Sequence, residues 1–171
     1  VLLVSNTYDE LGQLSKTELG EALQSQEYAY NIRGWLTSIN QGVLAVNDKN
    51  KFAMKLDYDV ASVFNGNIGK MYWQTLGVGG PEVEQSYAFQ YDGADRMLNA
   101  TYASSGINNH FNVHDLKFDF NGNIQKIKRS AYGNAADDLD YSYTGNQLIS
   151  VADGIDQSTH GNELFDDSDS P

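Results

Sequence analysis

The stretch Phe120-Asn121-Gly122-Asn123-Ile124 decides the fold, because it recurs letter for letter as Phe64-Asn65-Gly66-Asn67-Ile68. An internal repeat of this kind indicates a chain built from similar structural units. Asn-Gly between β-forming residues favours a two-residue hairpin turn in which both central residues take positive φ. We therefore expect an antiparallel β-hairpin at each copy.

A looser form of the same pattern, an aromatic residue, polar turn residues with glycine, and then an aliphatic residue, occurs four more times. Aromatic residues also alternate before several turns, as in Tyr28-Ala29-Tyr30 and Tyr141-Ser142-Tyr143, which places their rings in one row on one face of a strand. The sequence thus predicts an all-β fold of antiparallel hairpin repeats that form an extended, curved sheet. The six copies start at residues 8, 30, 64, 91, 120 and 143, and the predicted turn positions are Gly12, Gly34, Gly66, Gly93, Gly122 and Gly145.

Two features fit this pattern less simply. Leu36 and Ile39 are three residues apart, as are Ile124 and Ile127, so each pair needs either a β-bulge or a strand covered on both faces. The sequence leaves these alternatives open. Between residues 15 and 26, Gly20 interrupts a short helical spacing of leucines, and we predict a loop with a short turn there.

The stretch Tyr8-Asp9-Glu10-Leu11-Gly12-Gln13-Leu14 resembles the YD-repeat unit, whose usual form is Tyr-Asp, two residues, Gly, Arg or Asn, and then Leu. Residues 28–39 and 91–98 resemble the same unit in bacterial RHS-repeat proteins, and the resemblance extends over residues 8–152. Asp95 stands where the usual glycine would be, with Gly93 two residues earlier, and Thr144 replaces the aspartate of the last copy.

This resemblance implies long β-sheets that wrap into a hollow shell. In RHS proteins and related toxin subunits the shell encloses a toxic polypeptide, and in teneurins a similar shell belongs to an adhesion ectodomain. Six hairpins are too few for a shell, so we expect a segment of a larger bacterial surface or secreted protein. The expected organisation is a lead-in strand or tail over residues 1–7, the repeat domain over 8–152, and an acidic tail or truncated connection over 153–171.

The composition argues against several classes of function. The chain has 171 residues, with 11 Lys and Arg against 23 Asp and Glu, which gives a formal net charge of −12. This balance argues against nucleic acid as a partner, because phosphate contacts need clustered basic residues. The absence of cysteine removes disulfides, thiolate metal sites and thiol catalysis. Val1-Leu2-Leu3-Val4 is too short for a signal peptide or a membrane span, so we expect no membrane insertion.

Two groups of residues suggest metal chemistry. His110 and His114 are four apart and Asp115 follows, but the surrounding sequence predicts a loop or strand entry rather than the helix on which such a pair binds one metal. Surface histidines are the favoured interpretation. The acidic residues Asp137, Asp138 and Asp140, and those of the tail at Asp166, Asp167 and Asp169, lack the spacing of a calcium loop. A solvated turn and a solvated tail are favoured there.

Basic and aromatic residues give two further candidates. Lys126 and Lys128 beside Arg129 form the densest basic stretch, and alternation on a strand favours lysines that protect a sheet edge or cover a sheet. Aromatic rings on a sheet more often stack on cross-strand neighbours, but an exposed ring can bind sugar or protein. Trp35 and Trp73 are the candidates for that role.

These observations favour a non-enzymatic structural or interaction module, with no predicted catalytic, cofactor-binding or metal-binding residue. Its expected partners are neighbouring repeats of the parent chain, or other copies through unpaired sheet edges. The alternative hypothesis is an adhesion module that binds carbohydrate or a surface partner through exposed aromatic residues. An extracellular or cell-surface location is expected from the family resemblance alone.

Overall fold

The computed structural model describes residues 3–21, 23–42, 44, 50–58, 60, 65–105 and 107–155. Within them the protein is all-β, with antiparallel pairing between successive strands, as the hairpin pattern predicted. The chain divides into two compact units, an N-terminal subdomain (Val1–Ala88 and Ala103–Gly106) and a C-terminal subdomain (Phe89–Tyr102 and Ile107–Pro171). The single repeat domain expected over residues 8–152 therefore contains two compact parts.

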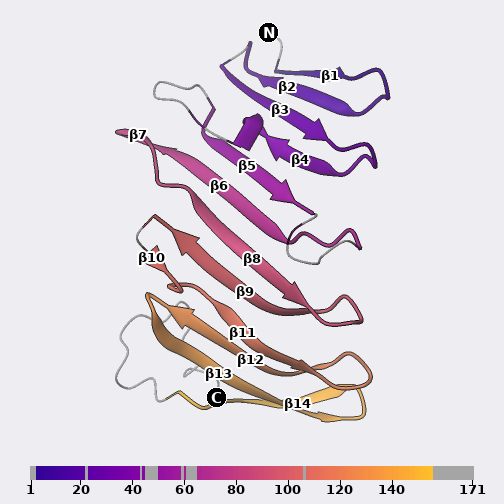
Figure 1. Ribbon diagram of the computed structural model, residues 1–171, viewed down its shortest axis with the longest axis vertical. Helices are drawn as coiled ribbons and strands as arrows, with labels where there is room; N and C mark the ends of the chain where they lie inside the picture. Colours follow the sequence, from indigo (N-terminus) through magenta and orange to yellow (C-terminus); the bar gives the residue numbers. More distant parts are fainter. Residues whose placement is uncertain are drawn as a thin grey trace. The chain divides into compact units, whose positions relative to one another are not determined.

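The N-terminal subdomain has the hydrogen-bonded strand order β1-β2-β3-β4-β5-β6-β8, and β7 pairs with β6 (Figure 1). The first strand belongs to the first hairpin, so the expected lead-in over residues 1–7 is largely strand. The bounds are β1 (Val4–Tyr8), β2 (Leu14–Leu19), β3 (Gln24–Tyr30), β4 (Leu36–Ile39), the 3₁₀ turn η1 (Asn40–Gly42), β5 (Phe52–Asp57), β6 (Lys70–Gly77), β7 (Gly80–Pro81) and β8 (Gln85–Tyr91).

The C-terminal subdomain has the order β9-β11-β12-β13-β14, and β10 pairs with β9 (Figure 1). Strands β8 and β9 each contribute residues to both subdomains. The expected tail boundary at residue 153 coincides with the end of β14, while residues 156–171, with their three predicted tail aspartates, lie outside the described part. The bounds are β9 (Met97–Ser104), β10 (Ile107–Asn108), β11 (Val113–Phe118), β12 (Ile124–Ala131), β13 (Asn134–Thr144) and β14 (Gln147–Asp153).

The loop predicted between residues 15 and 26 is wrong, because β2 and β3 occupy most of it and pair with each other from Lys16↔Glu27 to Leu19↔Gln24. Every residue of β2 is half-buried, so neither face of the strand is clearly apolar. A strand without a fully covered face lacks the period-two alternation by which strands are recognised in a sequence. Gly20 and Glu21, both with positive φ, reverse the chain between the two strands.

Each subdomain has few fully buried apolar residues. Ala53 and Leu56 are buried in the N-terminal subdomain, and Ala100, Tyr102 and Leu116 in the C-terminal one. Most other strand residues are half-buried, including nearly all of β6 and β12. The fold therefore depends strongly on strand pairing and on contacts between neighbouring side chains within the sheet.

Candidate functional site

The hairpin turn is the most regular feature of the chain. In the turn between β11 and β12, the Asp119 N–H donates to the Asn123 carbonyl (3.0 Å) and the Gly122 N–H donates to the Asp119 carbonyl (3.2 Å). Gly122 has φ +89°, whereas Asn121 is not among the residues with positive φ. This is the three-residue connection with one left-handed residue, and the two-residue Asn-Gly turn expected here is wrong.

An Asp or Asn side chain closes each of these turns from within. Asp119 Oδ1 accepts hydrogen bonds from the backbone N–H groups of Asn121 and Asn123, both at 2.8 Å. The side-chain amide of Asn123 also donates to Asp119 and holds the pKa of Asp119 below its ordinary value. The same pattern of backbone donors is found at Asp9, Asn31 and Asp92. Gly12 and Gly34 supply the left-handed residue in the first two turns.

Gly93 does not have the role expected of it. It lies in the turn that starts at Asp92, but its φ is outside the left-handed region, and Asp95 takes that conformation instead, with φ 62°. The Asp95 N–H donates to the Asp92 carbonyl (3.1 Å), as the glycine does in the other turns. The residue three positions after the Asp or Asn that starts the turn is therefore left-handed here as in the other turns, but it is an aspartate instead of a glycine. The Arg96 backbone and side chain donate to Asp92 and lower its pKa.

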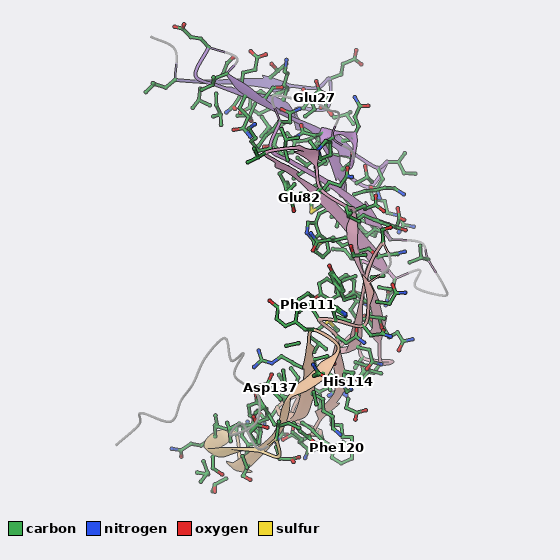
Figure 2. All side chains as sticks on the ribbon, turned by 90° about the vertical axis from the view of Figure 1, so that its left-hand side faces the viewer. Glu27, Glu82, Phe111, His114, Phe120 and Asp137 are labelled. Atoms are coloured by element: carbon green, nitrogen blue, oxygen red, sulfur yellow. The ribbon has the colours of Figure 1, made fainter. Side chains whose placement is uncertain are left out.

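The two identical pentapeptides lie in different connections, and Phe64 of the first one is outside the described residues. Asn65 and Gly66 lie in the long connection from β5 to β6, of which residues 59 and 61–64 are outside the described part. Tyr58 directly follows β5, and Phe64, the predicted start of this copy, lies outside the described residues. In the later hairpin β11 ends at Phe118 rather than at Phe120. Phe120 instead lies fully exposed at the β11–β12 turn (Figure 2). The repeats therefore start at residues 8, 30, 58, 91, 118 and 143.

A one-residue register shift follows the turn in the hairpins that start at Tyr8, Tyr30, Phe118 and Tyr143. In the second hairpin Tyr30 pairs with Leu36 but Ala29 pairs with Ser38, so Thr37 is the extra residue. Its hydroxyl donates to the Ala29 carbonyl (3.1 Å). This shift answers the question left open by the sequence, because a bulge lies between Leu36 and Ile39, and an equivalent one between Ile124 and Ile127.

Tyrosine hydroxyls connect successive repeats. The Tyr30 hydroxyl donates to the Leu14 carbonyl (2.9 Å), the Tyr58 hydroxyl to the Leu36 carbonyl (2.8 Å), and the Tyr143 hydroxyl to the Ile124 carbonyl (2.8 Å). In each case the acceptor is the aliphatic residue that follows the turn of the preceding hairpin and precedes the bulge. Burial raises the pKa of Tyr58, which keeps its hydroxyl a donor across the physiological range. We call this contact, with the strand pairing around it, the repeat junction.

The basic and acidic stretches neutralise each other. Strand β12 pairs with both β11 and β13, so of the two expected roles of its lysines the protection of a sheet edge is wrong, and the covering of a sheet face remains. Lys126 Nζ lies 2.6 Å from Asp138 and 2.9 Å from Asp140, and Arg129 Nε lies 2.6 Å from Asp137 (Figure 2). The hydrogen bond from Lys126 lowers the pKa of Asp138, and that of Lys126 is raised in turn.

The predicted histidine pair does not converge. His110 lies in the turn before β11, where its ring contacts Phe111 and Tyr132 edge-on at centroid distances of 6.1 and 6.5 Å. His114 lies in β11 opposite Lys128, and the Asp115 carboxylate lies 3.6 Å from the Lys128 ammonium. Among the described residues, no group of three or more His, Asp or Glu side chains is arranged to hold a metal ion.

Both tryptophans are half-buried among neighbouring groups. Trp35 lies 5.1 Å from the Tyr58 ring and beneath the Arg33 guanidinium (5.0 Å), and a Cβ on Gly66 would come within 2.6 Å of its indole. Trp73 stacks on Tyr87 at 5.6 Å. The glycine of the Asn65-Gly66 pair thus provides space for an indole ring as well as a turn.

Sequence reasoning missed a second hairpin connection and the aromatic cluster beside it. Tyr132 and Gly133, with φ 51° and 83°, reverse the chain between β12 and β13, where Ala131 pairs with Asn134. The ring of Tyr132 packs on Phe111, which packs edge-on against the buried Tyr102, both at 5.2 Å. The dipeptide Tyr-Gly followed by Asn is the signal that could have identified this turn. The remaining predicted glycine, Gly145, lies in the two-residue connection from Thr144 to Gln147.

Within the described residues, each outermost strand has one backbone edge without a partner strand and carries exposed apolar side chains. In β14 every residue is exposed, including Leu148, Ile149 and Val151, and its pairing within the described part is to β13. In β1, Val4 and Tyr8 are exposed, and that strand pairs with β2. These edges and the repeat junctions are the arrangements from which a function can be argued.

No described helix has the length and apolar character needed to cross a membrane. No model of a known protein family matches the sequence, and no curated protein matches it closely enough to count as a relative.

Proposed function

We propose that this chain is a structural segment of a YD/RHS-repeat β-shell in a larger bacterial surface or secreted protein, and that it acts by extending a sheet. One observation carries the proposal: the same junction geometry recurs at four of the five junctions between successive hairpins in the described part. The β9/β11 junction departs from it, because Val113 pairs with Ala100 and Asp115 takes a positive φ. The rule holds at β2/β3, β4/β5, β6/β8 and β12/β13. In each, start from the aliphatic residue that follows the turn of one hairpin: the residue two positions after it pairs with the residue three positions before the aromatic residue that starts the next repeat. The pairs are Lys16↔Glu27, Ser38↔Lys55, Lys70↔Ala88 and Lys126↔Asp140.

This recurrence supports a sheet-building role for a physical reason. The side chains at these pairs differ in charge and size, so the register is not set by one kind of cross-strand contact. All four junctions have the aromatic residue of the next repeat at the same distance, and three of them, at β2/β3, β4/β5 and β12/β13, follow a turn with a bulge after it. A chain built this way adds hairpins in one fixed register, and such repeats are stabilised mainly by their nearest neighbours.

Removal of a junction hydroxyl tests the proposal. Tyr30→Phe and Tyr143→Phe should each cost about 1 kcal/mol, because a partly buried carbonyl loses its donor. In native-state hydrogen exchange of the full chain, Tyr30→Phe should accelerate exchange in β1–β4, and Tyr143→Phe should do so in β11–β14. Tyr8→Phe, measured in dilute protein, is the matched control, because its hydroxyl makes no hydrogen bond within the described residues. Equal exchange in Tyr30→Phe and in the control would refute a junction-based scaffold.

The location and the parent protein are tested separately. An antibody raised against this chain should label intact producing cells or their culture medium, and labelling only after lysis would contradict a surface or secreted location. The full reading frame should contain flanking repeats of aromatic residue, Asp or Asn, left-handed residue and aliphatic residue. The carbohydrate-binding alternative has less support, since Trp35 and Trp73 both pack against neighbouring rings.

A further inference from the structure

The two open edges of the chain carry complementary halves of a repeat junction. Strand β14 has the acceptor half: Leu148 is the aliphatic residue after the last turn, and the register shift that follows it makes Ile149 the extra residue. Strand β1 has the donor half, since Tyr8 is the aromatic residue that ends the first strand of a hairpin. Tyr8 is 59% exposed, and its hydroxyl makes no hydrogen bond within the described residues.

We infer that two copies of this chain associate head to tail, with β1 of one copy added to β14 of the other in the junction register. The rule shared by four of the five internal junctions in the described part then pairs Ser150 with Ser5 and Val151 with Val4. It also places the Tyr8 hydroxyl at the Leu148 carbonyl, as Tyr30 is placed at Leu14. The inference rests on the proposed sheet-extending role and deepens it by naming the partner.

Backbone directions agree with this register. The Leu3 carbonyl accepts from Gly20, so odd residues of β1 face β2 and Val4 faces the open side. Gly154 donates to the Asp138 carbonyl, so even residues of β14 face β13 and Val151 faces its open side. The register derived from the internal junctions therefore brings together two residues whose free N–H and C=O groups point toward each other.

The side chains at both edges suit pairing. Strand β1 contains no charged residue and β14 contains one, Asp153, although the chain as a whole has a formal net charge of −12. Sheet edges that stay unpaired usually carry lysine, proline or inward-pointing charge, and these two lack such protection apart from that aspartate. Val4 and Val151, which would face each other across the new ladder, are 50% and 46% exposed. Raised salt should favour the association, because it screens the repulsion between two acidic chains.

Head-to-tail pairing uses different surfaces on the two copies, so it leaves one β1 and one β14 free and permits longer assemblies. Proline at an outward-facing position removes the donor needed for pairing between copies but none used within the chain. Val4→Pro therefore blocks the β1 edge and Val151→Pro blocks the β14 edge. Val4→Thr is the matched control, because it keeps the N–H group and the β-branch.

Sedimentation velocity on the full chain, over a range of concentrations and at low and high salt, tests the inference. The wild-type protein and Val4→Thr should form a concentration-dependent series, each proline variant alone should stay monomeric, and a mixture of the two proline variants should form dimers and nothing larger. Wild-type protein that stays monomeric under all conditions overturns the inference. So does association of Val4→Pro alone, which would mean pairing of β14 with β14, or of Val151→Pro alone, which would mean pairing of β1 with β1.

Tyr8→Phe gives a second readout that does not depend on proline. It should weaken the association roughly 2- to 10-fold, the usual effect of one hydrogen bond, without changing the circular dichroism of the monomer. An unchanged dissociation constant would refute the role of Tyr8 even if a proline variant failed to fold. Failure of the head-to-tail inference can be distinguished from failure of the proposed function. If Tyr30→Phe disturbs its own junction while the wild-type chain stays monomeric, only the head-to-tail inference is wrong.

Discussion

Gly122 and Gly93 occupy turns of the same subdomain, yet alanine at these two positions should change stability in opposite directions. Gly122 has φ +89°, and nothing lies within 4 Å of an added Cβ, so only backbone conformation opposes a side chain. The left-handed conformation costs an alanine about 1–2 kcal/mol. The lower entropy of the unfolded alanine chain returns about 0.4–1 kcal/mol. Gly122→Ala should therefore destabilise the C-terminal subdomain by about 1 kcal/mol.

Gly93 also has open space around an added Cβ, but its φ lies outside the left-handed region. Only the entropy effect remains there, so Gly93→Ala should stabilise the same subdomain by about 0.4–1 kcal/mol. Both tryptophans lie in the N-terminal subdomain, so their fluorescence is a poor probe of this difference. Hydrogen exchange of peptides from β9 to β14, followed by mass spectrometry in increasing urea, measures it directly. Equal effects of the two substitutions, or a larger loss at Gly93, would refute the turn geometry described for both sites.

Three further predictions concern the same subdomain. Asp95→Gly should raise its stability by about 0.5–1 kcal/mol in urea titrations, because glycine adopts the left-handed conformation without the strain that a side chain imposes. The pKa of Asp119 is lowered by its hydrogen bond from Asn123, so folding stability should be lost as the pH falls below the ordinary value of 3.8. Asp119→Asn should flatten that part of the pH profile, because the asparagine has no titrating group but keeps a side-chain oxygen that accepts the hydrogen bonds of the turn. Lys126→Met removes the cation that pairs with both Asp138 and Asp140, although Lys128 still pairs with Asp138. It should lower the melting temperature and reduce the dependence of melting on salt, and a salt response equal to that of wild type would contradict the ion-pair geometry.

The sequence predicted the hairpins because their determinants are local. An Asx residue, a residue that tolerates positive φ and a following aliphatic residue lie within seven positions of one another, and they specify the turn without distant contacts. Pentapeptide identity was less informative than this spacing. Phe64 and Phe120 precede Asn-Gly in the same way, but β5 ends at Asp57, just before Tyr58, and β11 ends at Phe118. The spacing from aromatic to aliphatic residue, rather than the shared letters, follows the structure.

The remaining features depend on tertiary contacts. The tyrosine contacts between repeats are not local, because each hydroxyl lies 16 to 22 residues away from the carbonyl that accepts its hydrogen bond. Strand β2 and the first residues of β3, Gln24–Gln26, were missed because their half-buried residues give no apolar alternation. The meeting of the lysines of β12 with the aspartates of β13 was not predicted, because it depends on the Tyr132-Gly133 reversal between them, which the sequence analysis did not identify.

The repeat junction fixes hairpins at one end only. The tyrosine contact, the bulge and the Asx turn all lie at the turn end, whereas the connections from one hairpin to the next range from two residues after Ala131 to twelve between Ile39 and Phe52. Because the hairpins are aligned at their turn ends, residues can be added in the connections at the opposite ends without displacing any paired strand. The connections between hairpins are thus the places where such a protein can acquire new loops, and with them new binding specificities, while its sheet stays the same.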